Sequence, residues 1–166
     1  MARILIVGGG CSGRQLAQRL LAGGHAVRIT TRTEQGRAAI EQTGAECWVG
    51  TPDRLETLRG SLDRVAVACW LLAAAEGDGE ALAALHTTRL ELFLTQAIDT
   101  TVRGFLYEAP AGAQGPVADG KRIALALTER NAIPARILSE DRADQPAWQA
   151  AAMAAIGSFL GEPAAA

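Results

Sequence analysis

Residues 4–13 read Ile-Leu-Ile-Val-Gly-Gly-Gly-Cys-Ser-Gly, and this stretch decides the fold. A short apolar run, typical of a buried strand, meets a glycine cluster, and a segment with helical spacing follows at once. Gly8, Gly10 and Gly13 within it form the pattern G-x-G-x-x-G. A strand, a glycine-rich turn and a helix in this order are typical of the first unit of a dinucleotide-binding domain.

Each glycine of this pattern has a physical purpose. Gly8 lets the chain turn sharply out of the strand, Gly10 lets a diphosphate approach the backbone, and Gly13 lets the helix pack closely on the sheet. The N–H groups at the start of a helix and the helix dipole favour an anion there. We therefore expect Gly8, Gly10, Cys11, Ser12 and Gly13 to contact a bound nucleotide.

Strand and helix patterns alternate along the rest of the chain. Strands are predicted over residues 3–7, 26–31, 46–49, 65–72, 102–107 and 133–138, and helices over 12–23, 34–43, 52–60, 80–98, 118–131 and 145–160. Six such units predict an α/β fold with a doubly wound, mostly parallel six-stranded sheet of order 3-2-1-4-5-6 and helices on both faces. The alternative is a five-stranded doubly wound sheet with a different order.

Length and composition limit the organisation and the partners. The 166 residues, of which 49% are hydrophobic, predict one domain over 1–162 and a frayed tail over 163–166. The formal net charge of −2, with both signs mixed along the chain, does not favour a nucleic-acid or anionic membrane surface. No apolar run is long enough to span a bilayer. We expect a monomer or a homodimer.

Three cysteines, Cys11, Cys47 and Cys69, are scattered and odd in number, which favours a reducing cytoplasm over a disulfide framework. No cluster of His, Cys, Asp and Glu has the spacing of metal ligands, so we expect no metal site.

The end of the second strand indicates which dinucleotide binds. An NAD site usually places Asp or Glu there, but this chain has Thr31, Arg32 and Thr33. A guanidinium offers a ribose 2′-phosphate paired, charge-assisted hydrogen bonds, which an acid would replace by repulsion. The sequence thus predicts NADP, with NAD less favoured, and Arg14 could approach the same phosphate. The alternative is that Arg32 is an ordinary solvated loop residue.

The chain resembles the atypical short-chain dehydrogenase/reductase superfamily, in particular its NmrA-like and epimerase-like NAD(P)-binding domains. The resemblance lies in residues 8–13, 24–32 and 50–53, which are similar to the phosphate loop, the second strand with its NADP-type Arg, and the segment after the third strand. Thr51 replaces an Asp that is usual in that segment. The resemblance implies a Rossmann fold and an NAD(P) cofactor.

The catalytic motif of that superfamily, Tyr-x-x-x-Lys, does not match. The only tyrosine is Tyr107, the residue four positions on is Ala111, and Lys121 lies too far along the chain. The remaining candidate is Glu108, just past the fifth strand, where ligands lie in such sheets. It is a candidate general base, or else a loop carboxylate or a helix-capping partner.

Other residues have two interpretations. Trp70, late in the fourth strand, either lines the cofactor cleft or packs in the core, and His86 is expected to be packed or exposed rather than catalytic. Trp148 begins a helical stripe that is expected to pack on the sheet, with any surplus available for a dimer contact. The crevice beyond the fourth and fifth strands is expected to be shallow, mostly apolar and low in charge.

Two functions follow from these observations. The first is a small NADP(H)-dependent oxidoreductase of unknown substrate that lacks Tyr-x-x-x-Lys. The second is a non-enzymatic NADP-binding sensor or protein-interaction module. Both take the dinucleotide as a partner, together with an unidentified small molecule or protein.

Overall fold

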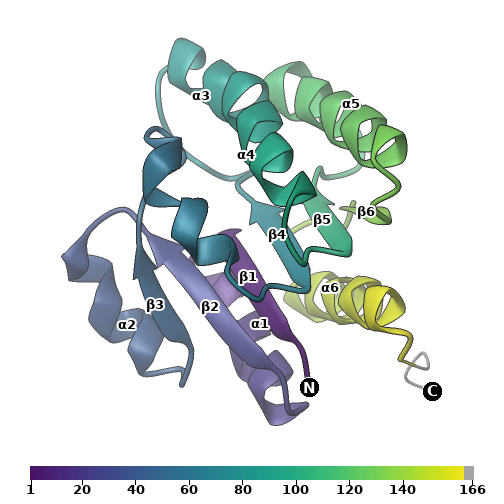
Figure 1. The fold of residues 1–166 in the computed structure, drawn as a ribbon. Helices are drawn as coiled ribbons and strands as arrows, with labels where there is room; N and C mark the ends of the chain where they lie inside the picture. Colours follow the sequence, from purple (N-terminus) through teal and green to yellow (C-terminus); the bar gives the residue numbers. More distant parts are fainter. Residues whose placement is uncertain (163–166) are drawn as a thin grey trace.

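A computed structural model describes residues 1–162 of the chain (Figure 1). Six strands form one parallel sheet in the order β3-β2-β1-β4-β5-β6, which confirms the predicted six-stranded order. The strands are β1 (Arg3–Gly8), β2 (Ala26–Thr31), β3 (Glu46–Val49), β4 (Val67–Leu71), β5 (Gly104–Glu108) and β6 (Ala135–Leu138). The predicted tail at 163–166 lies outside the described residues.

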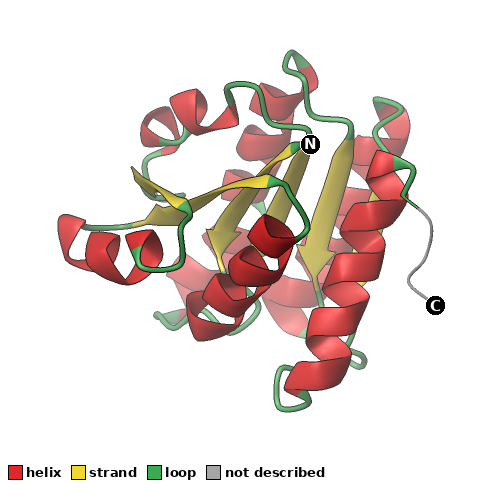
Figure 2. Cartoon of the chain, turned by 90° about the horizontal axis from the view of Figure 1, so that it is seen from below, coloured by secondary structure: helices red, strands yellow, loops and turns green. Residues whose placement is uncertain are grey.

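Helices cover both faces of this sheet (Figures 1 and 2). One face carries α1 (Gly10–Ala22) and α6 (Gln145–Leu160), which pack against each other, with α2 (Arg37–Glu41) beside β3. The other face carries α3 (Gly79–His86), α4 (Thr88–Ile98) and α5 (Gly115–Arg130). The arrangement is a Rossmann-like doubly wound fold.

Two hydrophobic cores lie between the sheet and its helices. Side chains of a strand alternate between the two faces, so Ile4 and Ile6 enter the core under α1 and α6. Leu5 and Val7 enter the core under α3 and α4. Every residue of β4 and β5 is buried, as expected for parallel strands covered on both faces.

The prediction of a helix over residues 52–60 is wrong. The segment forms two short 3-10 turns instead, η2 (Leu55–Thr57) and η3 (Arg59–Leu62). Side chains there bond to carbonyl oxygens that would accept from the backbone in an α-helix. The Thr57 hydroxyl donates to the Arg54 carbonyl oxygen at 2.6 Å. The Trp48 indole N–H donates to the Thr57 carbonyl oxygen at 2.7 Å. Such local bonds compete with a helix.

The helix predicted over 80–98 is divided at Thr87, whose backbone leaves the helical region with φ −122° and ψ −89°. The Thr87 hydroxyl donates to the Ala83 carbonyl oxygen at 2.6 Å, and the next residue is also a threonine. Threonine hydroxyls that bond back to the preceding turn often bend helices. The predicted helix over 34–43 likewise opens with a 3-10 turn, η1 (Glu34–Gly36).

A buried polar pair joins β5 to the layer of α3 and α5. The Tyr107 hydroxyl lies 2.7 Å from His86 Nδ1, and both side chains are buried. The space for that hydroxyl is provided by Gly120 of α5, where an added Cβ would overlap the Tyr107 oxygen and lie 2.7 Å from the His86 carbonyl oxygen. This contact holds α5 against the sheet.

We predict that Gly120→Ala lowers the free energy of unfolding by about 1–3 kcal/mol, because the overlap outweighs the helix propensity that Ala gains. Gly157→Ala in α6 is the matched control, since its Cβ would meet only the flexible Glu162 side chain at 3.4 Å. The control should be neutral or slightly stabilising in urea unfolding. Equal stability of the two variants would contradict the prediction.

Candidate functional site

A cavity of about 300 Å³ opens at the carboxyl ends of β1 and β4, where the strand order reverses. Its lining includes Gly8, Gly9 and Gly10 of the loop after β1, Arg32 after β2, and Arg142 from the loop between β6 and α6. In open parallel sheets, ligands bind at this switch point. The structure thus brings the glycine loop and Arg32 to one cavity.

The glycine loop has a left-handed backbone, with φ of 81° at Gly8 and 53° at Gly10. A Cβ on Gly8 would overlap the Leu72 side chain, so no residue with a side chain fits at this position. A Cβ on Gly10 would meet no atom within 4 Å and would occupy open space at the cavity. Helix α1 begins at this point, and the N–H groups of its first turn have no partner within the helix. The loop therefore fits a diphosphate.

The residues after β2 lie as the sequence predicts only in part. Arg32 is exposed and lines the cavity, and Thr33 is also exposed. The Thr31 hydroxyl donates to the Thr33 carbonyl oxygen at 3.2 Å and packs against Gly36. Its bonding gives Thr31 a role in shaping the strand end.

Arg14 and Cys11 lie elsewhere. Arg14 donates to the Cys11 sulfur at 3.0 Å, and the two line a separate depression between α1 and α2. The structure therefore brings Arg32 to the cavity but not Arg14. Ser12 and Gly13, by contrast, are buried in the first turn of α1.

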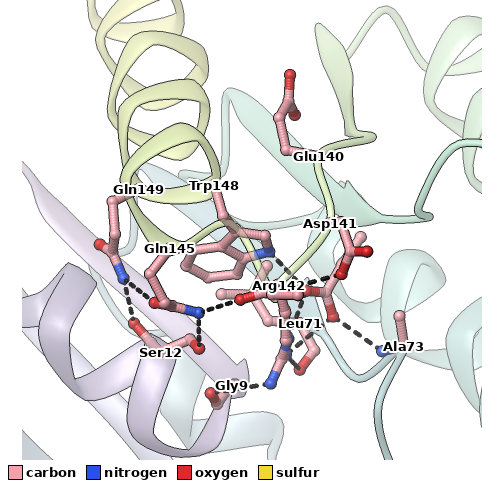
Figure 3. Close-up of polar contacts among 12 residues, drawn as sticks. Gly9, Ser12, Leu71, Ala73, Glu140, Asp141, Arg142, Gln145, Trp148 and Gln149 are labelled. Carbon is pink, nitrogen blue, oxygen red and sulfur yellow. Dashed lines mark hydrogen bonds and ion pairs between the residues drawn. The ribbon is translucent and has the colours of Figure 1, made fainter.

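Arg142 is the residue of this site that the sequence reasoning missed. Its Nε donates to Glu108 Oε2 at 2.7 Å and its Nη2 to Glu108 Oε1 at 2.9 Å. Its guanidinium also donates to the carbonyl oxygens of Gly9 at 3.2 Å and Leu71 at 2.9 Å (Figure 3). One side chain thus joins the ends of β1, β4 and β5.

Glu108 is fully buried, and its carboxylate is fully bonded. Besides the two bonds from Arg142, Oε1 accepts from the Ala73 N–H at 3.0 Å and Oε2 from the Trp148 indole N–H at 2.9 Å. A carboxylate has about four lone-pair sites, and these four donors occupy them. The carboxylate borders a second cavity, of about 150 Å³, with Ala73, Pro110 and Asp141. Its bonding favours holding Arg142 over accepting a proton.

Helix α6 also holds the start of α1. Gln145 Nε2 donates to the Ser12 hydroxyl oxygen at 2.7 Å, and Gln149 Nε2 donates to the Ser12 carbonyl oxygen at 2.9 Å (Figure 3). Because the Ser12 hydroxyl accepts from Gln145, its own proton is left to donate elsewhere. The predicted packing of Trp148 on the sheet is confirmed, since this side chain is fully buried.

The prediction that the crevice carries few charges is wrong. Arg142 enters both cavities, and Asp141 and Glu76 line one each. Arg142 and Asp141 come from the loop after β6, so their place depends on how the chain folds back over the sheet. Trp70 packs in the core against Phe93, with ring centroids 4.9 Å apart, and does not line the cleft.

Tyr107 faces away from this crevice. Its hydroxyl contacts His86 and donates to the Val117 carbonyl oxygen at 3.2 Å, under α3 and α5. Burial raises the pKa of the Tyr107 phenol and lowers the pKa of the His86 imidazole. Both side chains are therefore neutral near pH 7. His86 is buried, so of its two expected places the packed one is right and the exposed one is wrong.

No protein-family model matches the chain, and no curated protein sequence does. Solved structures do match. A putative NAD-dependent epimerase/dehydratase from Bacillus halodurans superposes with a TM-score of 0.72 at 16% identity, over 84% of this chain and 70% of that one. A short-chain dehydrogenase/reductase superfamily protein from Agrobacterium tumefaciens with bound NAD gives 0.67 at 20%, over 82% and 48%.

The triphenylmethane reductase of Citrobacter sp., complexed with NADP(H), gives a TM-score of 0.65 at 19% identity, over 83% of this chain and 49% of that one. The chain shares the fold of these proteins. The fold that the sequence resemblance implies is therefore the fold that the structure has. It spans about half the length of the Agrobacterium and Citrobacter structures.

None of the helices within residues 1–162 is long and apolar enough to cross a membrane. Across the same residues, no group of three His, Cys, Asp or Glu side chains could hold a metal ion.

Proposed function

We propose that the chain binds a nicotinamide dinucleotide in this crevice, and NADP(H) in preference to NAD(H). The observation that carries the proposal is that the glycine loop and Arg32 line one cavity of about 300 Å³. Gly8 and Gly10 would hold the diphosphate together with the backbone N–H groups of Cys11 and Ser12, with Gly13 allowing the close turn. Arg32 and Thr33 would hold the phosphorylated ribose at the strand end that Thr31 shapes. When bound, the nicotinamide supplies or accepts a hydride.

The preference for NADP(H) rests on charge at the end of β2. Arg32 is exposed at the cavity, and the acid that would bind two ribose hydroxyls is replaced by Thr31. A guanidinium binds a phosphate through two parallel N–H···O bonds, which a ribose hydroxyl cannot match. Among the matching solved structures, two carry NAD and one carries NADP(H), and a likeness in fold at under 25% identity favours neither cofactor.

Calorimetric titration of the purified chain with NADPH and with NADH tests this proposal. We expect NADPH to bind at least ten times more tightly, the difference of one charge-assisted contact. Equal affinities would refute the preference for NADPH, and no binding of either nucleotide would refute the site.

A chain that binds this cofactor could have either of two functions. The first is reduction of a small carbonyl compound or enone, with the proton supplied by water or by a side chain at the crevice. The second is a non-enzymatic sensor or protein-interaction module, which is favoured by the four bonds to the Glu108 carboxylate and by the burial of Tyr107. NADPH consumption against a panel of aldehydes, ketones and quinones separates them: turnover supports the reductase, and stoichiometric binding without turnover supports the module.

A further inference from the structure

We propose that Arg142 is a second cationic ligand of the dinucleotide, which binds its diphosphate, and that Glu108 and Trp148 position it. This inference rests on the proposed function and assigns a residue that the glycine motif does not include. Arg142 lines the same cavity as Gly8, Gly10 and Arg32.

Within residues 1–162, the hydrogen bonds of Arg142 leave one of its N–H groups without a partner. A guanidinium has five N–H groups, and four of them are used: Nε and Nη2 donate to Glu108, Nη2 also to Leu71, and Nη1 to Gly9. The remaining N–H is on Nη1, the nitrogen that is bonded to the glycine loop. The side chain is 24% exposed and lines the cavity.

The guanidinium is held in place before any ligand binds. Glu108, which is fully buried, accepts two of its N–H groups, and the guanidinium carbon lies 5.5 Å from the centroid of the Trp148 ring. Trp148 in turn donates to Glu108 at 2.9 Å. A preorganised donor loses little conformational entropy on binding, which favours affinity.

The position of Nη1 fits a diphosphate rather than the adenosine half of the ligand. Nη1 lies 3.2 Å from the Gly9 carbonyl oxygen, next to Gly10, whose missing side chain opens the cavity at the first turn of α1. Arg32 lines the same cavity from the loop after β2. Two cations and one acid, Glu76, therefore line the cavity, which suits a ligand with two separate anionic groups.

Titration of Arg142→Gln with four nucleotides tests the assignment. We expect the dissociation constants of NADPH, NADH and ADP, which all contain a diphosphate, to rise about 10- to 100-fold, the value of a hydrogen bond to a charged group. Adenosine 2′-monophosphate lacks the diphosphate, and its affinity should change less than about threefold on the same scale. Arg130→Gln is the matched control, because Arg130 is exposed at the end of α5 and does not line this cavity; all four affinities should stay within about threefold.

The outcomes separate the two proposals. If the wild type binds NADPH and Arg142→Gln binds it equally well, the assignment of Arg142 fails and the proposed function stands. If the wild type binds neither dinucleotide, the proposed function fails. If ADP and adenosine 2′-monophosphate weaken together, Arg142 acts only on the shape of the loop, and the assignment fails. Should Arg142→Gln not fold, Arg142→Lys carries the test, since it too should weaken ADP more than adenosine 2′-monophosphate.

Discussion

Replacing Arg32 by Glu should weaken NADPH binding about 100-fold or more and leave NADH binding within about tenfold of the wild type. The substitution removes a charge-assisted hydrogen bond of about 1.5–3 kcal/mol and adds repulsion between two anions. NADH has no phosphate at this position, and a carboxylate there can accept from the ribose hydroxyls. Competitive fluorescence titration with both nucleotides measures the ratio.

The control for Arg32→Glu is Arg130→Glu, which makes the same change of net charge at an exposed position near the end of α5. It should leave both affinities unaltered within error. A loss that is equal for NADPH and NADH in Arg32→Glu would show that Arg32 does not recognise the 2′-phosphate. The preference for NADP(H) would then lose its support.

Replacing Glu108 by Ala should lower the free energy of unfolding by about 3–5 kcal/mol, as expected when one partner of a buried ion pair is removed. The substitution leaves Arg142, the Trp148 indole N–H and the Ala73 N–H without their acceptor. For a chain of this size, the melting temperature should fall by roughly 8–15 °C. Thermal unfolding followed by circular dichroism measures the shift.

Glu129→Ala is the matched control for Glu108→Ala, because Glu129 is an exposed acid on α5. Surface substitutions of this kind usually change stability by less than about 0.5 kcal/mol. If Glu108→Ala were as stable as Glu129→Ala, the ion pair with Arg142 would not hold the ends of β1, β4 and β5 together. The positioning of Arg142 by Glu108 would then be wrong as well.

The sheet could be predicted because its signals are local. The apolar run Ile4–Val7 and the glycines after β1 lie within one short window of sequence, and each of the other strands gives a similar local signal. Helix bounds were less predictable where side chains compete for backbone partners. Thr57 and Thr87 do so, and there the expected helices become 3-10 turns or divide.

The site was predictable only where it lies in the glycine loop and at Arg32. Arg142 follows Glu140 and Asp141, and this charged run is typical of a solvated loop. Its partner, Glu108, is 34 residues earlier, and the two meet only because β5 and β6 are neighbours in the sheet. Trp148, assigned to packing from the sequence, also donates to Glu108. Contacts of this kind depend on the order of the strands in the sheet, and a local sequence pattern does not show which distant residues that order brings together.

The bonds from α6 to Ser12 have a consequence for the order in which a newly made chain matures. Ser12 and Gln149 are 137 residues apart, and Gly9 and Arg142 are 133 apart. A ribosome therefore completes the glycine loop long before it makes the side chains that restrain it. Contacts between such distant residues form late, because the long loop between them must first close. The glycine loop is thus made well before it can reach its final geometry, and release of the chain before Arg142 would leave the loop without these restraints.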